Sequence, residues 1–459
     1  MKLTGSLVRH LLVSLCGFSI VSGAHAAGKE SQVQAGVATI DITPGYPIRL
    51  SGYASRKKES EGVAQHLWAK ALAIGSDKEG PAILITVDNT GVPASVRNEV
   101  VRRLQKRKGI NPERLALCSS HSHTAPCLAG NLPTLFGEPL PPEHQAHIQR
   151  YTRELIDALE KVAINALKDR RASKLCWGEG KAGFAANRRT KGGPVDHDLP
   201  ILVVTDEKDK IRAIVANYAC HCTTLGGETN LICGDWAGYA QEYLQRDHPG
   251  AIALTAIGCG ADANPAPRTG LDFAKQHGQE IATSVVEILT RTLTPVRGRL
   301  ECRAKTIELP FDKLPTREEW EQKAKQTDYV GYYARVNLAK LDRGESLETQ
   351  LPYLIQTWNF GNDLAIIFLP GEVVVDYSLR LKKEFDSSRL WINAYANDVP
   401  CYVPSERILK EGGYEGGGAM VYYDRPARLA PGIEALIINA VHDLLPRSFL
   451  TDEKRATFP

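Results

Sequence analysis

Short apolar runs alternate with amphipathic helical patterns along almost the whole chain, and this alternation limits the folds that the chain can adopt. Continuous apolar runs are typical of buried strands, whereas apolar residues at every third or fourth position are typical of helices that cover a sheet. The pattern predicts an α/β fold, with mixed β-sheets flanked by helices in one large domain and a site at the strand ends. Strands are predicted at residues 37–42, 82–87, 115–118, 201–205, 213–219, 251–257, 365–369 and 390–394.

Three segments carry the clearest helical periodicity. In residues 142–167 apolar side chains recur at three or four positions from Ile148 to Ala166, which places one apolar stripe against a sheet. Similar patterns at 273–293 and 433–445 predict two more helices, and a further helix is predicted at 373–385. No repeat, low-complexity tract or Gly/Ser linker interrupts this order, so one domain is predicted over 33–447, followed by a tail at 448–459.

The first 26 residues have the pattern of a cleaved export signal. Lys2 and Arg9 precede the apolar run 11–21, and the small-residue site Ala24-His25-Ala26 follows it. We therefore expect the mature protein to be secreted or periplasmic. No other stretch approaches the roughly 20 apolar residues that span a bilayer, so no transmembrane segment is predicted.

Charge and cysteine content exclude some functions and leave others open. With 56 basic and 53 acidic residues, the net charge of +3 indicates no field strong enough to attract nucleic acid, which is excluded as a partner. Ten cysteines, one of them in the export signal, leave an odd number in the mature chain. Their spacing determines no disulfide pairing.

Two histidine-containing segments each follow a predicted strand. His121 and His123 come after the strand 115–118, and in an extended segment their side chains would share one face. His221 follows the strand 213–219 in the same way. Zinc takes ligands from separate strand ends, so His121 and His221 are candidate metal ligands. The alternatives are two ordinary loop histidines, and a thiolate pair or disulfide partner made from Cys220 and Cys222.

Three further segments could supply polar groups to the same site. Glu372 lies in a Pro-Gly-Glu turn after the strand 365–369, although a glutamate there is also an ordinary first-turn residue of a helix. The loop 397–423 is rich in Gly and Tyr, and either brings phenols into a site or connects elements at the surface. The segment 258–265 could line a pocket and offer amide donors to an oxyanion, or form a tight turn capped by Asp262.

Taken in order, these segments resemble the catalytic region of the neutral/alkaline non-lysosomal ceramidase family, and the resemblance covers most of the chain from about Val37 onward. Residues 40–44, 52–53 and 120–126 match the family's opening motif, its Gly-Tyr pair and its THTHSGP stretch. The resemblance implies that His121 is a zinc ligand and that His123 works beside the metal.

The later motifs extend the resemblance. His221, Glu372 and Tyr402 fall on the family's second zinc histidine, on the glutamate of its PGE turn and on the metal-binding tyrosine of its GYV motif. Tyr414 matches a site tyrosine in YEGG, and Arg188 matches the arginine of an NR motif near the substrate amide. Asp262 and Asn264 lie in the stretch aligned with GDxSPN. Here Asn264 replaces a serine that is assigned a catalytic role, and an amide cannot act as a nucleophile.

The resemblance implies an exported zinc-dependent amidohydrolase that cleaves the N-acyl amide bond of ceramide or a related N-acyl lipid by attack of metal-bound water. One Zn²⁺ per chain is expected, together with peripheral contact to the lipid surface, and a second, structural Ca²⁺ or Mg²⁺ stays open. The family's C-terminal β-sandwich domain is expected to be absent. A zinc hydrolase of a different exported amide or ester and a non-catalytic binding protein on the same fold are the alternatives. The sequence does not determine the oligomeric state. The expected metal ligands are His121, His221, Glu372 and Tyr402, and the expected catalytic residues are His123, Arg188, Tyr414, Asp262 and Asn264.

Overall fold

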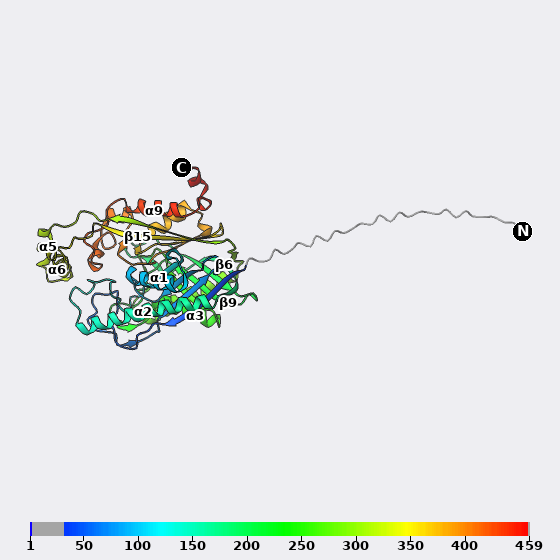
Figure 1. The fold of residues 1–459 in the computed structure, drawn as a ribbon, viewed down its shortest axis with the longest axis horizontal. Helices are drawn as coiled ribbons and strands as arrows, with labels where there is room; N and C mark the ends of the chain where they lie inside the picture. Colours follow the sequence, from blue (N-terminus) through cyan, green and yellow to red (C-terminus); the bar gives the residue numbers. More distant parts are fainter. Residues whose placement is uncertain (2–31, 458–459) are drawn as a thin grey trace. The chain divides into compact units, whose positions relative to one another are not determined.

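The predicted strands pair into two main sheets, seen in the computed structural model, which describes residue 1 and residues 32–457 (Figure 1). The larger sheet is nine-stranded and has the order β11-β9-β8-β6-β1-β3-β4-β5, with β13 paired to β6. Its β4–β5 and β9–β11 pairs are parallel and the others are antiparallel, so the predicted mixed sheet is confirmed. The strands are β1 Val33–Asp41, β3 Trp68–Ile74, β4 Ala82–Val87, β5 Leu115–Ser119, β6 Arg171–Lys181, β8 Asp198–Thr205, β9 Ile211–Tyr218, β11 Ile252–Ile257 and β13 Thr294–Pro295.

A four-stranded sheet in the order β14-β15-β16-β18 packs on one face of the larger sheet. Aromatic side chains such as Trp358 and Phe368 meet Trp177 and Leu202 of the larger sheet in a shared core. The strands of this sheet are β14 Leu300–Pro310, β15 Gln350–Phe360, β16 Leu364–Phe368 and β18 Leu390–Asn393. Three two-stranded pairs complete the β structure, namely β2 Gly62–Val63 with β10 Leu231–Ile232, β7 Ala185–Asn187 with β12 Ala263–Pro265, and β17 Glu372–Val373 with β19 Tyr402–Val403.

Helices cover the outer face of each sheet. On the large sheet, alternate side chains such as Ile83 and Ile201 pack against α1 to α4, while the side chains between them face the second sheet. Helices α7 and α9 cover the small sheet, so the layers run helix, sheet, sheet, helix (Figure 1). The helices are α1 Ala94–Lys108, α2 Pro142–Lys168, α3 Asp235–Asp247, α4 Leu271–Leu289, α5 Arg317–Ala324, α6 Tyr329–Asp342, α7 Val375–Glu384, α8 Glu406–Glu411, α9 Ile433–Leu444 and α10 Asp452–Thr457.

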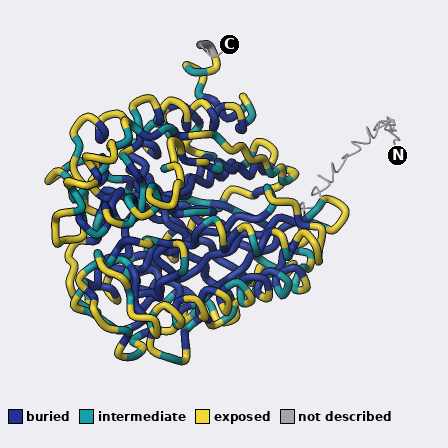
Figure 2. The backbone as a smooth tube through the Cα atoms, turned by 60° about the vertical axis from the view of Figure 1, so that its left-hand side comes forward, coloured by how far each residue is buried: buried dark blue, intermediate teal, exposed yellow. Residues whose placement is uncertain are grey.

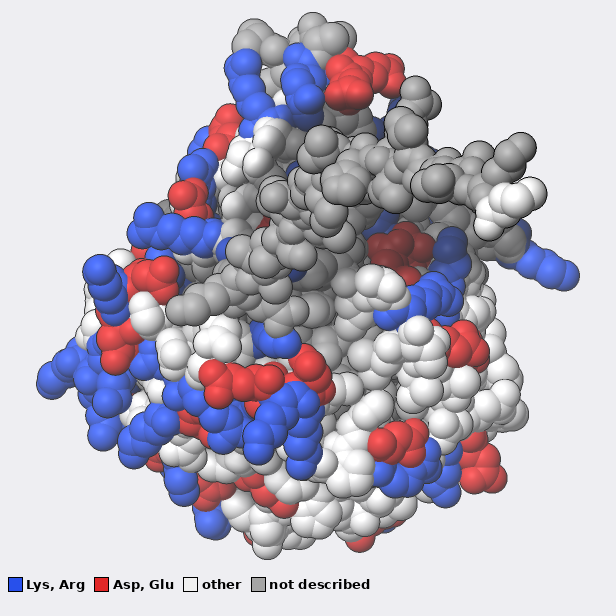
Figure 3. All heavy atoms as spheres, turned by 90° about the vertical axis from the view of Figure 1, so that its right-hand side faces the viewer, with Lys and Arg blue, Asp and Glu red and all other residues white. Residues whose placement is uncertain are grey.

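Burial follows this layering. Figure 2 shows buried, dark-blue backbone through the middle of the described chain and exposed, yellow segments around its outside. Figure 3 shows Lys and Arg interspersed with Asp and Glu over the visible part of one face, in keeping with the near balance of charges in the sequence. Within the described part of the chain, no helix has both the length and the apolar content to cross a membrane.

The structure changes the secondary structure predicted around Glu372. The helix predicted at 373–385 begins later, at Val375, because residues 372–373 pair as β17 with β19. The Glu372 amide donates to the Cys401 carbonyl over 3.0 Å, so Glu372 is a strand residue and not a first-turn residue of α7. The predicted export signal, residues 1–26, lies outside the described residues apart from residue 1.

Candidate metal centre and active site

Four side chains from distant parts of the chain meet at the ends of the strands. His121 follows β5 and His221 follows β9, while Glu372 and Tyr402 face each other in register in the parallel β17–β19 pair. All four residues are at most 3% exposed. The structure therefore brings together the four groups that the resemblance implies as metal ligands.

Three separations among these four groups match the edge of a tetrahedral site. Glu372 Oε2 lies 3.3 Å from His121 Nε2 and 3.1 Å from His221 Nε2. Tyr402 Oη lies 3.3 Å from His221 Nε2. Ligand atoms bound tetrahedrally at about 2.0–2.1 Å from a zinc ion are about 3.3 Å from one another. The donor set and its spacing thus suit a zinc-like cation, whose ligands are nitrogen and oxygen here.

Backbone carbonyls orient both imidazoles. His121 Nδ1 donates to the Thr90 carbonyl over 2.6 Å, and His221 Nδ1 donates to the Gly260 carbonyl over 2.9 Å. With the proton on Nδ1, each Nε2 presents a lone pair to the centre, as metal-ligating histidines do. Burial lowers the pKa of His221 to about 4, which favours the neutral ring that a metal requires.

The carboxylate is held ionised. Burial alone would raise the pKa of Glu372, but the adjacent His121 and His221 imidazoles, in the form that carries a proton on Nε2, lower that pKa well below its usual range. The hydroxyl of Tyr423 donates to Glu372 Oε1, which leaves Oε2 facing the imidazoles. Sequence reasoning missed Tyr423, although it ends the Tyr-rich loop that the sequence marks as a source of phenols.

His123 lies beside this centre, on the wall of a cavity. Its Nε2 is 3.0 Å from His121 Nε2, and the histidines at 121, 123 and 221 form a cluster whose ligand atoms lie within 4.8 Å of one another. The extended conformation predicted for this segment is wrong, since His121 has φ +57°. The two rings nevertheless converge, because the chain turns after β5 and its Ser122 bridges to Cys222 beyond β9.

Arg188 connects the metal centre to the cavity. Its Nη2 donates to Tyr402 Oη over 3.0 Å, and its Nε donates to Glu415 Oε1 over 2.7 Å. The Tyr414 ring lies 5.2 Å from that of Tyr402, and Tyr414 is 46% exposed and lines the cavity. Although burial opposes its charge, Tyr402 and Glu415 raise the pKa of Arg188 well above its ordinary value.

Asp262 and Asn264 have different positions. Asp262 is fully buried, and its carboxylate accepts from the Val375 amide over 2.9 Å and from Asn187 Nδ2 over 3.1 Å. Asn264 lines the cavity, where its Oδ1 accepts from Thr223 and Arg188. Asp262 thus holds backbone and side-chain groups next to the site, whereas Asn264 lies on the cavity wall.

Four backbone amides of the glycine-rich loop around Asp262 are already hydrogen-bonded. The amides of Gly258, Gly260, Ala261 and Ala263 all donate to backbone carbonyls of the protein. These four amides are thus not free to bind an oxyanion, and the loop contributes the Gly260 carbonyl that orients His221. Cys220 and Cys222 both carry free, buried thiols, and no described pair of cysteines forms a disulfide.

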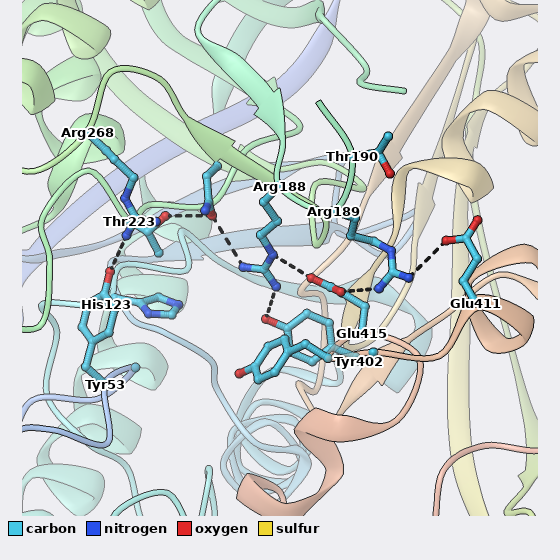
Figure 4. Close-up of a pocket in the computed structure, with 14 residues that line it drawn as sticks. Tyr53, His123, Arg188, Arg189, Thr190, Thr223, Arg268, Tyr402, Glu411 and Glu415 are labelled. Atoms are coloured by element: carbon cyan, nitrogen blue, oxygen red, sulfur yellow. Dashed lines mark hydrogen bonds and ion pairs between the residues drawn. The ribbon is translucent and has the colours of Figure 1, made fainter. Parts of the chain in front are cut away.

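The cavity above the centre has a volume of about 630 Å³ (Figure 4). His123, Arg188, Asn264, Tyr402 and Tyr414 line it, so it contains most of the predicted site. Sequence reasoning did not name as site residues five other charged or aromatic residues of its wall, which are Tyr53, Arg189, Arg268, Glu411 and Glu415. The sequence could have identified Glu415 as a site residue, because it follows Tyr414 within the YEGG motif.

Fold and site together define a layered α/β protein with a candidate metal centre at its strand ends. Residues 33–257 match the family model described as neutral/alkaline non-lysosomal ceramidase, N-terminal. The resemblance predicted from the motifs is therefore confirmed. The matched range holds His121, His123, Arg188 and His221, whereas Glu372, Tyr402 and Tyr414 lie beyond it.

Known proteins support the same relationship. The neutral ceramidases of Drosophila pseudoobscura pseudoobscura and Drosophila melanogaster are each 24% identical over 234 residues, which is 46% of this chain and 32% of theirs. The match thus spans about a third of the length of these relatives. The solved neutral ceramidase from Pseudomonas aeruginosa is 18% identical with a TM-score of 0.71, over 90% of this chain and 74% of that chain. A ceramidase complexed with C2 has a TM-score of 0.72 at 16% identity, over 91% of this chain and 76% of that chain. These two structures show the fold.

Proposed function

We propose that this chain is a metal-dependent amidohydrolase with one Zn²⁺ held by His121, His221, Glu372 and Tyr402. The observation that carries the proposal is the convergence of these four buried groups, with three ligand-atom separations of 3.1–3.3 Å and both imidazoles presenting Nε2. The match of residues 33–257 to the ceramidase family model supports the amide bond as the bond that is cleaved.

The residues around the centre have different roles in the proposed amide hydrolysis. A zinc ion bound there polarises a carbonyl and lowers the pKa of water. His123 transfers a proton to the leaving amine, because its Nε2 faces the centre where the amide would react. Its Nδ1 is buried and has no hydrogen-bond partner among the described residues, so no described group fixes which ring nitrogen carries the proton. Arg188 and Tyr414 donate hydrogen bonds to the carbonyl oxygen, and each such donor contributes about 3 kcal/mol to stabilisation of the transition state.

The substrate has two candidate classes. Ceramide or a related N-acyl lipid follows from the names of the relatives, and it would require contact with a membrane surface. A different exported amide or ester is favoured by Asn264 at the family's serine position and by the polar lining of the cavity. A non-catalytic binding protein on this fold would bind the metal without turnover.

Elemental analysis of the purified mature chain tests the metal. Wild type is expected to bind one equivalent of zinc, and His121→Ala and His221→Ala are expected to lose both metal and activity. His123→Ala is expected to keep the metal and to turn over at least about 100-fold more slowly, the usual contribution of a general acid–base group. A folded wild-type chain without stoichiometric metal after zinc supplementation would overturn the proposal.

We also propose that the chain is exported and cleaved after Ala26, on the pattern of its first residues. Sequencing the N-terminus of the protein recovered from the periplasm or medium tests this. A protein that keeps Met1 and stays with the cytoplasmic fraction would contradict it.

A further inference from the structure

Polar and charged residues make up most of the lining of the active-site cavity. Among the described residues that line it, none is Leu, Ile, Val, Met, Phe or Trp, and its larger rings are those of tyrosines and His123. An acyl or sphingoid chain gains affinity by burying methylene groups against apolar walls. This cavity lacks such walls, so its shape and chemistry suit a small polar molecule.

Three arginines and two glutamates give the cavity its charge, and both glutamates are already paired. Glu415 accepts from Arg188 over 2.7 Å and from Arg189 over 2.5 Å. Glu411 pairs with Arg189 over 3.1 Å and with Arg407 over 2.8 Å. Figure 4 shows this chain of ion pairs along one side of the cavity.

Arg268 stands on the other side of the cavity without an acidic partner. Its Nη2 donates to Tyr53 Oη over 3.1 Å, and no described carboxylate lies within ion-pair distance of it. Tyr53 is itself fixed, because its hydroxyl donates to the Leu225 carbonyl over 2.9 Å. The exposed guanidinium is thus held at the mouth of the cavity with donors left over for an anion.

Tyr53 lies between Arg268 and His123, the proposed acid–base residue, and contacts both. The Tyr53 ring lies edge-on to the His123 ring at 5.1 Å, and Figure 4 shows Arg268, Tyr53 and His123 on the same side of the cavity. Arg188 and Tyr414 define another part of the wall. If His123 protonates the leaving amine, then Arg268 lies toward the amine half of the substrate.

We propose that the substrate of this site is an N-acylated amino acid, whose carboxylate binds Arg268 while its acyl carbonyl faces Arg188 and Tyr414. This inference rests on the proposed amidohydrolase function and names its substrate class. Water adds across the amide bond, the acyl group leaves as a carboxylate, and the amino acid leaves with the proton that His123 supplies. Arg268 makes no contact with the reacting atoms and acts as a specificity residue.

Matched substrates that differ in charge test the proposal on the zinc-loaded mature chain. N-acetylglycine carries the carboxylate, N-acetylethanolamine is its neutral counterpart, and a long-chain ceramide in detergent represents the lipid class. Wild type is expected to hydrolyse N-acetylglycine with a kcat/KM at least about tenfold above that for N-acetylethanolamine, as expected for one charge-assisted contact. Arg268→Gln is expected to bring this ratio close to one, mainly by raising KM for N-acetylglycine.

The control is Arg303→Gln, at an exposed arginine of β14 that pairs with Glu301, and it is expected to keep the wild-type ratio. Equal kcat/KM values for the two acetyl compounds, an unchanged ratio in Arg268→Gln, or a preference for the ceramide would each overturn the inference. Stoichiometric zinc together with hydrolysis of the neutral or lipid substrate would then leave the proposed amidohydrolase intact. If neither acetyl compound turns over, the affinity of each for the zinc-loaded chain is measured by calorimetric titration. Tighter binding of N-acetylglycine supports the carboxylate site, and equal affinities contradict it.

Discussion

Gly52 gives His123 the space that its ring occupies. Gly52 has φ +89°, and a Cβ at this position would lie 2.4 Å from His123 Cγ. Gly52→Ala is expected to displace the His123 ring and to lower kcat at least about tenfold, since the proton donor moves away from its reacting geometry. The strained backbone is expected to cost about 1–3 kcal/mol of unfolding free energy. Steady-state kinetics and thermal unfolding measure the two effects.

Gly45→Ala is the matched control, because nothing lies within 4 Å of a Cβ at Gly45. It is expected to keep wild-type kcat. An equal loss in both variants would show that the effect of Gly52→Ala does not come from the contact with His123.

Tyr423 orients the carboxylate of the metal centre from behind. Its hydroxyl donates to Glu372 Oε1, and both side chains are buried. Tyr423→Phe removes this donor while keeping the ring, and groups of this kind are worth about 10–100-fold in metal affinity. Competition with a chromogenic chelator measures the zinc affinity. Tyr422→Phe removes a neighbouring hydroxyl outside the centre and is expected to bind zinc like wild type, whereas wild-type affinity in Tyr423→Phe would contradict this role.

At the scale of single elements, the short β17–β19 pair sets the register of two metal ligands. Glu372 lies opposite Tyr402 in this pair, and Asp262 holds the start of α7 through the Val375 amide. Asp262→Ala leaves that buried amide unpaired, which is expected to cost about 1–3 kcal/mol of unfolding free energy and to weaken zinc binding with it. Urea unfolding and the chelator assay test both. Loss of stability with unchanged zinc affinity would show that the register does not depend on Asp262.

Strand β3 carries a buried lysine whose titration affects stability. Lys70 Nζ donates to the Ala253 carbonyl over 2.8 Å and to Gln245 over 2.9 Å, and burial lowers the pKa of Lys70 to about 8. The folded state therefore releases this proton at a lower pH than the unfolded state, so wild type gains stability as the pH rises from about 8 toward 10.5.

Lys70→Met lacks this proton. Its free energy of unfolding relative to wild type is expected to fall by up to about 1.4 kcal/mol for each pH unit in that window. Urea unfolding at pH values of about 7.5, 8.5 and 9.5 checks this. Stabilities that run parallel across the three pH values would contradict it.

Elements with a strong local pattern were predictable, and elements that depend on distant partners were not. Residues 82–87 form β4 with the predicted bounds, and the helix predicted at 142–167 is α2 at Pro142–Lys168, because their apolar patterns are long and continuous. The sequence carried no comparable signal for β14, whose side chains are largely exposed between Leu300 and Pro310. Local pattern likewise placed Glu372 in a turn before a helix, since β17 exists only through its pairing with β19.

For the whole molecule, the sequence predicted which residue types meet but not how they meet. The left-handed turn at His121, the donation by Tyr423 and the orientation of His221 by Gly260 arise from contacts between segments that are far apart in the chain. The order of the four layers is likewise a property of packing, since the same alternating pattern is compatible with several strand orders. The order of the motifs predicted the residues of the metal centre, whereas the structure was needed to identify the groups that orient them, such as Tyr423 and Gly260.

The fold as a whole also determines which cysteine thiols are buried and how readily they react. No disulfide joins the nine described cysteines, and seven of them are buried, with Cys176 and Cys302 partly accessible. Burial raises the pKa of Cys127, Cys233 and Cys401 to about 12, so these thiols react slowly even in an oxidising compartment. Stability then comes from the packed core of a large domain and not from disulfide crosslinks.

A thiol count tests this on the mature protein purified without reductant. Nine thiols per chain are expected to react with a chromogenic disulfide reagent in denaturant, while the native chain is expected to react mainly at Cys176 and Cys302. Because no crosslink among the described cysteines contributes to stability, dithiothreitol is expected to leave Tm unchanged. A count below nine that rises after reduction, together with a lower Tm in dithiothreitol, would mean that the exported chain gains stability from a disulfide.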